Sequence, residues 1–214
     1  MQSDDPTTRS AILRAAEQLF AAQGFTATST KQIAAVARVN SALLYYYFGS
    51  KDNLYAETLE AVFGDMTEQR RRHTPVGQAP DVTLRALVQL LASFMSARPN
   101  APRLLARELL DHGTGLSDAG SRVPEFAAGM LRQLAEVVSA GQRGGSLRAE
   151  VDPELAAISI IGQVVYWFVA QPAVSSVRSA NEGKGSRTHA DFSRHAADFA
   201  LSALRPAPKR LFTE

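Results

Sequence analysis

The sequence predicts an all-α protein of about nine helices, and two observations support this fold class. Apolar residues recur every three or four positions along most of the 214 residues, which is the period of a helix. Runs of alternating apolar and polar residues bounded by turns, which would predict strands, are hard to find. We expect two domains, a small one at residues 1–50 and a larger helical one at residues 51–214.

Cap residues delimit three helices in the first fifty residues. Asp5–Pro6 has the pattern of a helix N-cap followed by Pro at the first helical position, and Gly24 ends that helix. Ser29 precedes Gln32 by the three residues of a capping box, which begins a second helix of about two turns. Asn40 is a suitable cap for a third short helix.

The remaining helices are separated by Pro, Gly and Ser. Ser50 caps a fourth, longer helix that ends near Arg70–Arg72, where cations suit a helix C-terminus. Residues 173–188 are rich in Ser, Gly and Asn and are interpreted as a mobile loop. The other predicted helices lie at 81–98, 101–112, 123–141, from Asp152–Pro153 onward, and at 189–204.

Composition excludes several classes of protein. Hydrophobic residues make up 45% of the chain and charged residues 21%, which excludes a collagen, a coiled-coil rod and a wholly disordered chain. The absence of cysteine excludes a disulfide scaffold and a cysteine nucleophile. The first twenty residues lack a basic start followed by an apolar run, so we expect no secretory signal and a cytoplasmic location.

The second and third helices are typical of a helix-turn-helix, whose second helix enters a DNA major groove. At about 100° per residue, Leu44 and Phe48 fall on one face and point inward. The side chains expected outside are Ala42, Leu43 and Tyr46, with Tyr45 and Tyr47 on the flanks. Alternatively the aromatic run belongs to the core, but three consecutive rings cannot all face inward on one short helix.

Charge distribution favours an anionic partner for this region. The net charge is only +2, but no Asp or Glu occurs between Gln18 and Lys51, while Lys31, Arg38 and Lys51 lie within or close that stretch. Thr28 and Lys31 lie at the start of the second helix and Lys51 at the start of the fourth, where side chains and helix N-termini suit phosphate groups. A cationic surface is therefore expected on a nearly neutral chain.

The stretch from Ile12 to Leu54 resembles the DNA-binding domain of the TetR (tetracycline repressor) family of bacterial regulators. The residues that carry the resemblance are Ile12-Leu13-x-Ala15-Ala16-x-x-Leu19-Phe20, Gly24-Phe25-x-Ala27-Thr28-Ser29, Ile33-Ala34, Ala37-x-Val39 and Leu44-Tyr45-x-x-Phe48-x-Ser50-Lys51. The resemblance implies a three-helix helix-turn-helix domain at residues 1–50 and a helical ligand-binding and dimerisation domain at residues 51–214.

The resemblance also implies residue roles. Thr28, Tyr45 and Lys51 match the family's phosphate-contacting positions. The variable base-reading positions are matched by Ser41, Ala42, Leu43 and Tyr46. The chain departs from the family pattern at three positions, and these departures concern which operator sequence it binds. Arg38 stands where the family usually has a turn Gly, Tyr47 stands where His is common, and Leu43 stands where Thr is common.

The segment from Leu155 to Ala170 is apolar on nearly every side. A membrane span is one interpretation, but sixteen residues are fewer than the roughly 20 that a span needs. The alternative is a helix that is buried on two sides, against its own domain on one side and against a second copy of the protein on the other. In the family the last two helices form such a dimer, which implies interface residues Ile158, Ile161, Val165, Phe192 and Phe199.

A small apolar or amphipathic effector is the expected ligand, although aromatic and Met residues at helical spacing are also typical of plain core. Candidate pocket residues are Phe63, Met66, Phe94, Met95, Leu105, Leu109, Phe126, Met130, Tyr166 and Trp167, and candidate polar ones are Arg103, Arg107, Glu108 and His112. Glu108 and His112 also share a helix face as possible metal ligands, but no third ligand is evident. We expect no metal, no other cofactor and no enzymatic activity, since no Gly-x-Ser-x-Gly elbow or phosphate loop occurs.

Three functions remain open from the sequence. The preferred one is a ligand-responsive transcriptional repressor that binds a palindromic operator as a homodimer. The others are an architectural or activating DNA binder without an effector, and an all-helical small-molecule carrier or enzyme.

Overall fold

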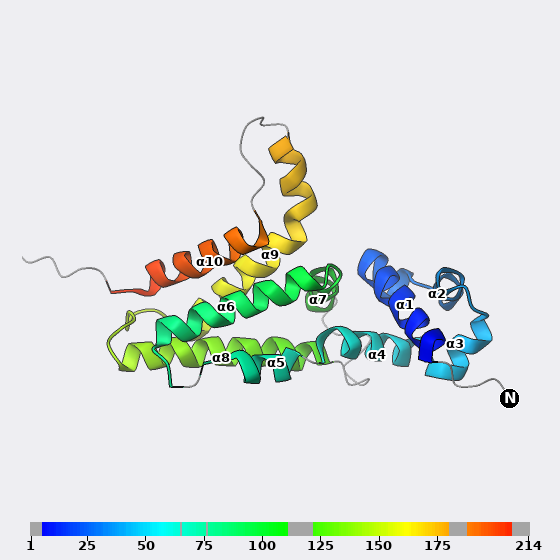
Figure 1. The fold of residues 1–214 in the computed structure, drawn as a ribbon, viewed down its shortest axis with the longest axis horizontal. Coiled ribbons are helices and arrows are strands. Elements are labelled where there is room, and N and C mark those ends of the chain that lie inside the picture. Colours follow the sequence, from blue (N-terminus) through cyan, green and yellow to red (C-terminus); the bar gives the residue numbers. More distant parts are fainter. Residues whose placement is uncertain (1–5, 65, 76, 111–121, 180–187, 207–214) are drawn as a thin grey trace, which may run out of the picture. The chain divides into compact units, whose positions relative to one another are not determined.

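The computed structural model describes residues 6–64, 66–75, 77–110, 122–179 and 188–206, which form ten helices and no strand (Figure 1). The helices are α1 Pro6–Ala27, α2 Thr30–Ala37, α3 Ser41–Phe48, α4 Lys51–Phe63, α5 Met66–His73, α6 Pro80–Ala97, α7 Ala101–Leu110, α8 Arg122–Arg143, α9 Pro153–Ser179 and α10 His189–Leu204. The chain divides into two compact units. The first comprises residues 1–68 and 97–127, and the second residues 69–96 and 128–214. The predicted all-α fold is confirmed, whereas the functional boundary at residue 50 stays a prediction.

The first unit is built around α1, which contacts α2, α4 and α7. Two short helices cannot bury enough apolar area alone, so the core of α2 and α3 is completed by their neighbours. Phe20 of α1 lies 4.7 Å from the ring of Tyr55 of α4 in an edge-to-face contact, and the Phe25 ring is 5.0 Å from Tyr55. Ile12, Ile33 and Leu44 are completely buried in the same unit.

Three predicted caps lie where the sequence placed them, whereas the predicted cap Asp5 lies outside the described residues. Ser29 and Gln32 form a complete capping box at the start of α2. Asn40 caps α3 by accepting a hydrogen bond from the Ala42 amide, and Ser50 caps α4 by accepting one from the Asn53 amide. Gly24 interrupts the helical backbone near the end of α1 with φ of 80°.

Two predicted boundaries are wrong. The expected single helix from Ser50 to Arg70–Arg72 is two helices, because α4 ends at Phe63 and α5 begins at Met66. Gly64 permits this end, since a Cβ there would lie 2.6 Å from the Glu60 carbonyl oxygen. The loop expected over 173–188 starts later, because α9 continues to Ser179 through a stretch free of Gly and Pro after Pro172. The rest of that expected loop lies outside the described residues, apart from Thr188.

The second unit packs α9 against α10. Ala157 and Val164 of α9 and Ala197 of α10 are completely buried. The rings of Trp167 and Phe192 stack with centroids 4.4 Å apart. Figure 1 shows that α9 is bent along its length. Its residue Pro172 has no N–H to donate to the preceding turn.

The α2–α3 turn contains a strained residue. Arg38 ends α2 with φ of 57° and ψ of 41°, and it is the only non-glycine residue with positive φ in the described part of the chain. Its N–H still bonds to the carbonyls of Ala34 and Ala35. This left-handed conformation costs a residue with a Cβ on the order of 1 kcal/mol, whereas Gly adopts it freely.

We therefore predict that Arg38→Gly raises the free energy of unfolding by about 0.5–1 kcal/mol. Arg38→Ala is the matched control, because it removes the same guanidinium and keeps the strained Cβ. Urea unfolding of both variants measures the effect. Equal stability of the two variants would show that the left-handed backbone stores no strain here.

Candidate nucleic-acid interface

The orientation of α3 is fixed by its two buried side chains. Leu44 is completely buried and Phe48 is 4% exposed. Because a helix turns by about 100° per residue, burial of this pair places Ala42 and Tyr46 at the centre of the opposite face. Ala42 is exposed, and Tyr46 is 70% exposed. Of the predicted base-reading residues, the structure thus places Ala42 and Tyr46 on one solvent-facing surface.

The flanks of α3 are ordered by contacts with neighbouring groups. The Tyr45 hydroxyl lies 3.3 Å from the Thr30 hydroxyl at the start of α2, while its side chain remains 51% exposed. The Tyr46 and Tyr47 rings meet edge to face at 5.2 Å. Ser41 and Leu43 are half-buried at the N-terminal end of α3.

Three cations lie on segments that precede or follow α3 in the chain. Lys31 is exposed in the first turn of α2, and Arg38 is exposed in the turn between α2 and α3. Lys51 begins α4, and its Nζ lies 4.2 Å from the centre of the Phe25 ring, which holds the charge near the α4 N-terminus. The sequence identified Arg38 both as a departure from a motif and as one of the cations of the expected surface. Its exposure now adds it to the candidate interface.

Thr28 occupies a different environment from the one expected. Its side chain is 1% exposed, and its hydroxyl donates a hydrogen bond of 2.6 Å to the Gly24 carbonyl. The hydroxyl therefore hydrogen-bonds the Gly24 carbonyl, at the point where the helical backbone of α1 is interrupted. For this reason we leave Thr28 out of the proposed phosphate contacts.

The expected ligand residues are divided between the two units. In the first unit Phe63, Met66 and Phe126 are buried, and the rings of Phe63 and Phe126 stack at 5.4 Å. In the second unit Phe94 and Met130 are buried, whereas Tyr166 is 70% exposed. Trp167 is half-buried by its stacking on Phe192.

The polar residues expected in the ligand pocket mostly make other contacts. Arg107 of α7 donates hydrogen bonds to the carbonyls of Ala21 (3.2 Å) and Ala22 (2.6 Å), near the end of α1. Glu108 accepts a 2.6 Å hydrogen bond from the Tyr55 hydroxyl. Arg103 is exposed and Met95 and Leu105 are buried. His112 and the side chain of Leu109 lie outside the described residues.

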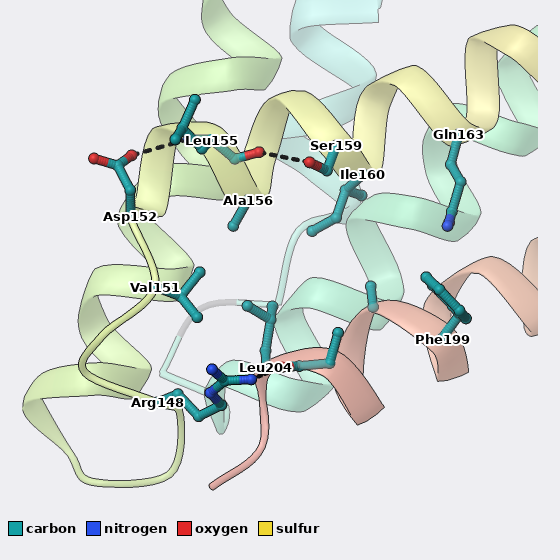
Figure 2. A pocket seen from close by; sticks show the side chains of 12 residues that line it. Arg148, Val151, Asp152, Leu155, Ala156, Ser159, Ile160, Gln163, Phe199 and Leu204 are labelled. Carbon is teal, nitrogen blue, oxygen red and sulfur yellow. Dashed lines mark hydrogen bonds between the residues drawn. The ribbon is translucent and has the colours of Figure 1, made fainter.

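No cluster of three potential metal ligands occurs among the residues that the structure describes. An apolar groove of about 390 Å³ lies in the second unit, between the N-terminal part of α9 and α10 (Figure 2). Arg148 and Leu204 lie at one end of the groove, and Gln163 and Phe199 at the other. Apart from Phe199, none of the residues expected for ligand or partner lines it.

An apolar stripe runs along the exposed side of α9. Its members recur at helical spacing and are Leu155 (63% exposed), Ile158 (50%), Tyr166 (70%) and Val169 (37%). Gly162 lies in the middle, and a Cβ there would meet nothing within 4 Å. Phe199 of α10 is also 54% exposed, whereas Ile161, Val165 and Phe192 are half-buried.

The sequence analysis did not identify Leu155, Gly162 and Val169 as members of an exposed surface. The segment is apolar on nearly every side, so its pattern does not indicate which side faces outward. The segment Pro153–Gln171 is long and apolar enough to cross a membrane by length and composition, and 22% of it is buried.

The chain resembles known regulators over nearly its whole length. The family model for bacterial regulatory proteins of the tetR family matches residues 12–58, and the model for a tetracyclin repressor-like C-terminal domain matches residues 80–198. The chain is 28% identical to the HTH-type transcriptional repressor NicS of Pseudomonas putida over 92% of both chains. It is 30% identical to the HTH-type transcriptional repressor KstR2 of Rhodococcus jostii, over 69% of this chain and 72% of that one.

Solved structures agree on the fold. The ketosteroid transcriptional regulator KstR2 of Mycobacterium tuberculosis superimposes with a TM-score of 0.74 at 19% identity, covering 96% of this chain and 98% of that one. The two short helices, their exposed outer face and these matches define a helix-turn-helix transcriptional regulator that binds DNA. More particularly, the chain belongs to the TetR family of bacterial regulators.

Proposed function

We propose that this regulator is a cytoplasmic repressor that binds a palindromic operator as a homodimer and releases it when a small apolar or amphipathic effector binds. The observation that carries the DNA-binding part is the solvent-facing surface of α3 with Ala42 and Tyr46 at its centre. Ser41, Leu43, Tyr45 and Tyr47 complete the surface, and Lys31, Arg38 and Lys51 supply its positive charge. Repression is supported by the relatives NicS and KstR2, which are both HTH-type transcriptional repressors.

The apolar stripe on α9 supports the homodimer. A stripe of exposed apolar side chains on a folded protein indicates an interaction surface, and Gly162 in its centre lets a second helix approach closely. The groove beside Phe199 lies on the same pair of helices, so we assign it to the same interface. Two protomers would hold their α3 helices about 34 Å apart, which matches successive major-groove faces of a palindrome.

A ligand releases DNA only if it binds the DNA-free conformation more tightly. Phe94 and Met130 are buried in the second unit and are the expected residues that best fit an apolar ligand there. Arg107 already donates to two α1 carbonyls, so a ligand that used it would compete with those bonds.

We predict that Tyr46→Ala lowers operator affinity by roughly tenfold, because it removes an exposed ring from the centre of the recognition face. Lys51→Ala should lower affinity less and flatten its salt dependence, because one phosphate contact per protomer is lost. Gel shifts at fixed salt measure both effects, and Val82→Ala, at a 45% exposed position in α6, is the control. Wild-type affinity of both variants would refute the helix-turn-helix contact.

We predict that Ile158→Glu converts the dimer to a monomer and weakens operator binding, because a carboxylate would be buried in the apolar interface. Val82→Glu is the matched control, because the exposed fractions are similar at 50% and 45%. Sedimentation equilibrium measures the dimer dissociation constant. A wild-type chain that stays monomeric at every concentration, or floats with lipid vesicles, would contradict the dimer.

We predict that an apolar or amphipathic compound at a hundred times its Kd stabilises the protein by about 2.7 kcal/mol, which raises Tm by roughly 5–10 °C. The same compound should lower operator affinity. A thermal-shift screen followed by gel shifts on the hits provides the measurement. Stabilising compounds that never lower operator affinity would favour an activating or architectural DNA binder without an effector.

A further inference from the structure

The exposed face of α3 lacks the side chains that read guanine and adenine by paired hydrogen bonds. Residues 41–48 contain no Arg, Lys, Asn, Gln, Asp or Glu. Bidentate readout uses Arg or Lys on guanine, and Asn or Gln on adenine. The hydroxyl groups of Ser41 and the tyrosines can each form single hydrogen bonds, which discriminate less between bases.

Two amide side chains of the helix-turn-helix, those of Asn40 and Gln32, are already used in helix caps. Oδ1 of Asn40 accepts a 2.9 Å hydrogen bond from the Ala42 amide. Oε1 of Gln32 accepts from the Ser29 amide at 2.8 Å and from the Ser29 hydroxyl at 3.0 Å. An adenine contact needs both the oxygen and the nitrogen of such an amide, so it would disrupt the cap of α3 or of α2.

The surrounding cations lie on other elements. Lys31 is in the first turn of α2, Arg38 in the turn, and Lys51 at the start of α4 over the Phe25 ring. Positions that flank a recognition helix face the sugar–phosphate backbone, so these cations supply affinity without base selectivity.

Resting on the proposed function, we propose that α3 reads the methyl groups of thymine with Ala42, Leu43 and Tyr46, so that A·T pairs occupy the operator positions beneath it. The thymine methyl projects into the major groove and is recognised by apolar contact. Ala42 is small enough for the helix to approach the bases, Leu43 adds an aliphatic surface, and Tyr46 adds a ring that is 70% exposed.

The test begins with selection of bound duplexes from a random pool by the full-length protein. Each thymine of the selected half-site is then replaced by deoxyuridine, which removes only the methyl group. We expect about a fourfold loss of affinity at each contacted thymine, since burial of one methyl-sized group contributes about 0.8 kcal/mol. Replacing a contacted A·T pair by a G·5-methyl-dC pair should retain more affinity than replacing it by G·dC.

Protein variants assign the contacts. Leu43→Ala should abolish the difference between thymine and deoxyuridine at one position, whereas Val82→Ala should leave every difference unchanged. Tyr46→Phe should keep wild-type affinity, because it removes the hydroxyl and keeps the ring. Arg38→Ala should weaken binding equally to all sequences. Thermal unfolding of each variant is the control that measures whether the fold is retained.

The outcomes separate this proposal from the broader one. If no sequence is enriched and the protein does not bind duplex DNA, both proposals fail. If a half-site is enriched but deoxyuridine has no effect, or Arg38→Ala relaxes a requirement for guanine, only the thymine-methyl contact is refuted. Loss of binding in Tyr46→Phe would also refute it, because base reading would then depend on a hydrogen bond.

Discussion

The burial of Leu44 and Phe48 is the constraint on which the candidate interface depends. These two side chains allow only one orientation of an eight-residue helix, and the N-cap Asn40 fixes where that helix begins. The same burial forces Tyr46 outward, since consecutive side chains on a helix point in different directions. The 70% exposure of Tyr46 is thus a consequence of the core packing beneath α3.

Polar contacts from α7 stabilise the same unit. Asn100, just before α7, bonds to Glu17 of α1 at 3.0 Å, and Arg107 and Glu108 bond to α1 and α4. A segment about fifty residues beyond α3 therefore packs with the DNA-binding helices. Any shift of α7 would move the acceptors and donors of α1 and α4, so the position of α3 depends on residues outside the helix-turn-helix.

Local signals explain which parts of the fold could be predicted from sequence. Ser29, Asn40 and Ser50 act within three residues of themselves, so their caps were identifiable. The break after Phe63 and the environment of Thr28 depend on contacts with residues four or more positions away. The pocket residues were least predictable, because a buried Phe in a core and a Phe lining a cavity have the same spacing in sequence.

Two tyrosines show why exposure alone does not define a partner. Tyr46 and Tyr166 are both 70% exposed. Tyr46 lies within a stretch of sequence that contains Lys31 and Arg38, is closed by Lys51 and has no acid, which suits a polyanion. Tyr166 instead lies in an apolar stripe with Gly162 at its centre, which suits a second helix. The neighbours of each ring, more than the ring itself, are the basis for proposing one surface for DNA and the other for a second protomer.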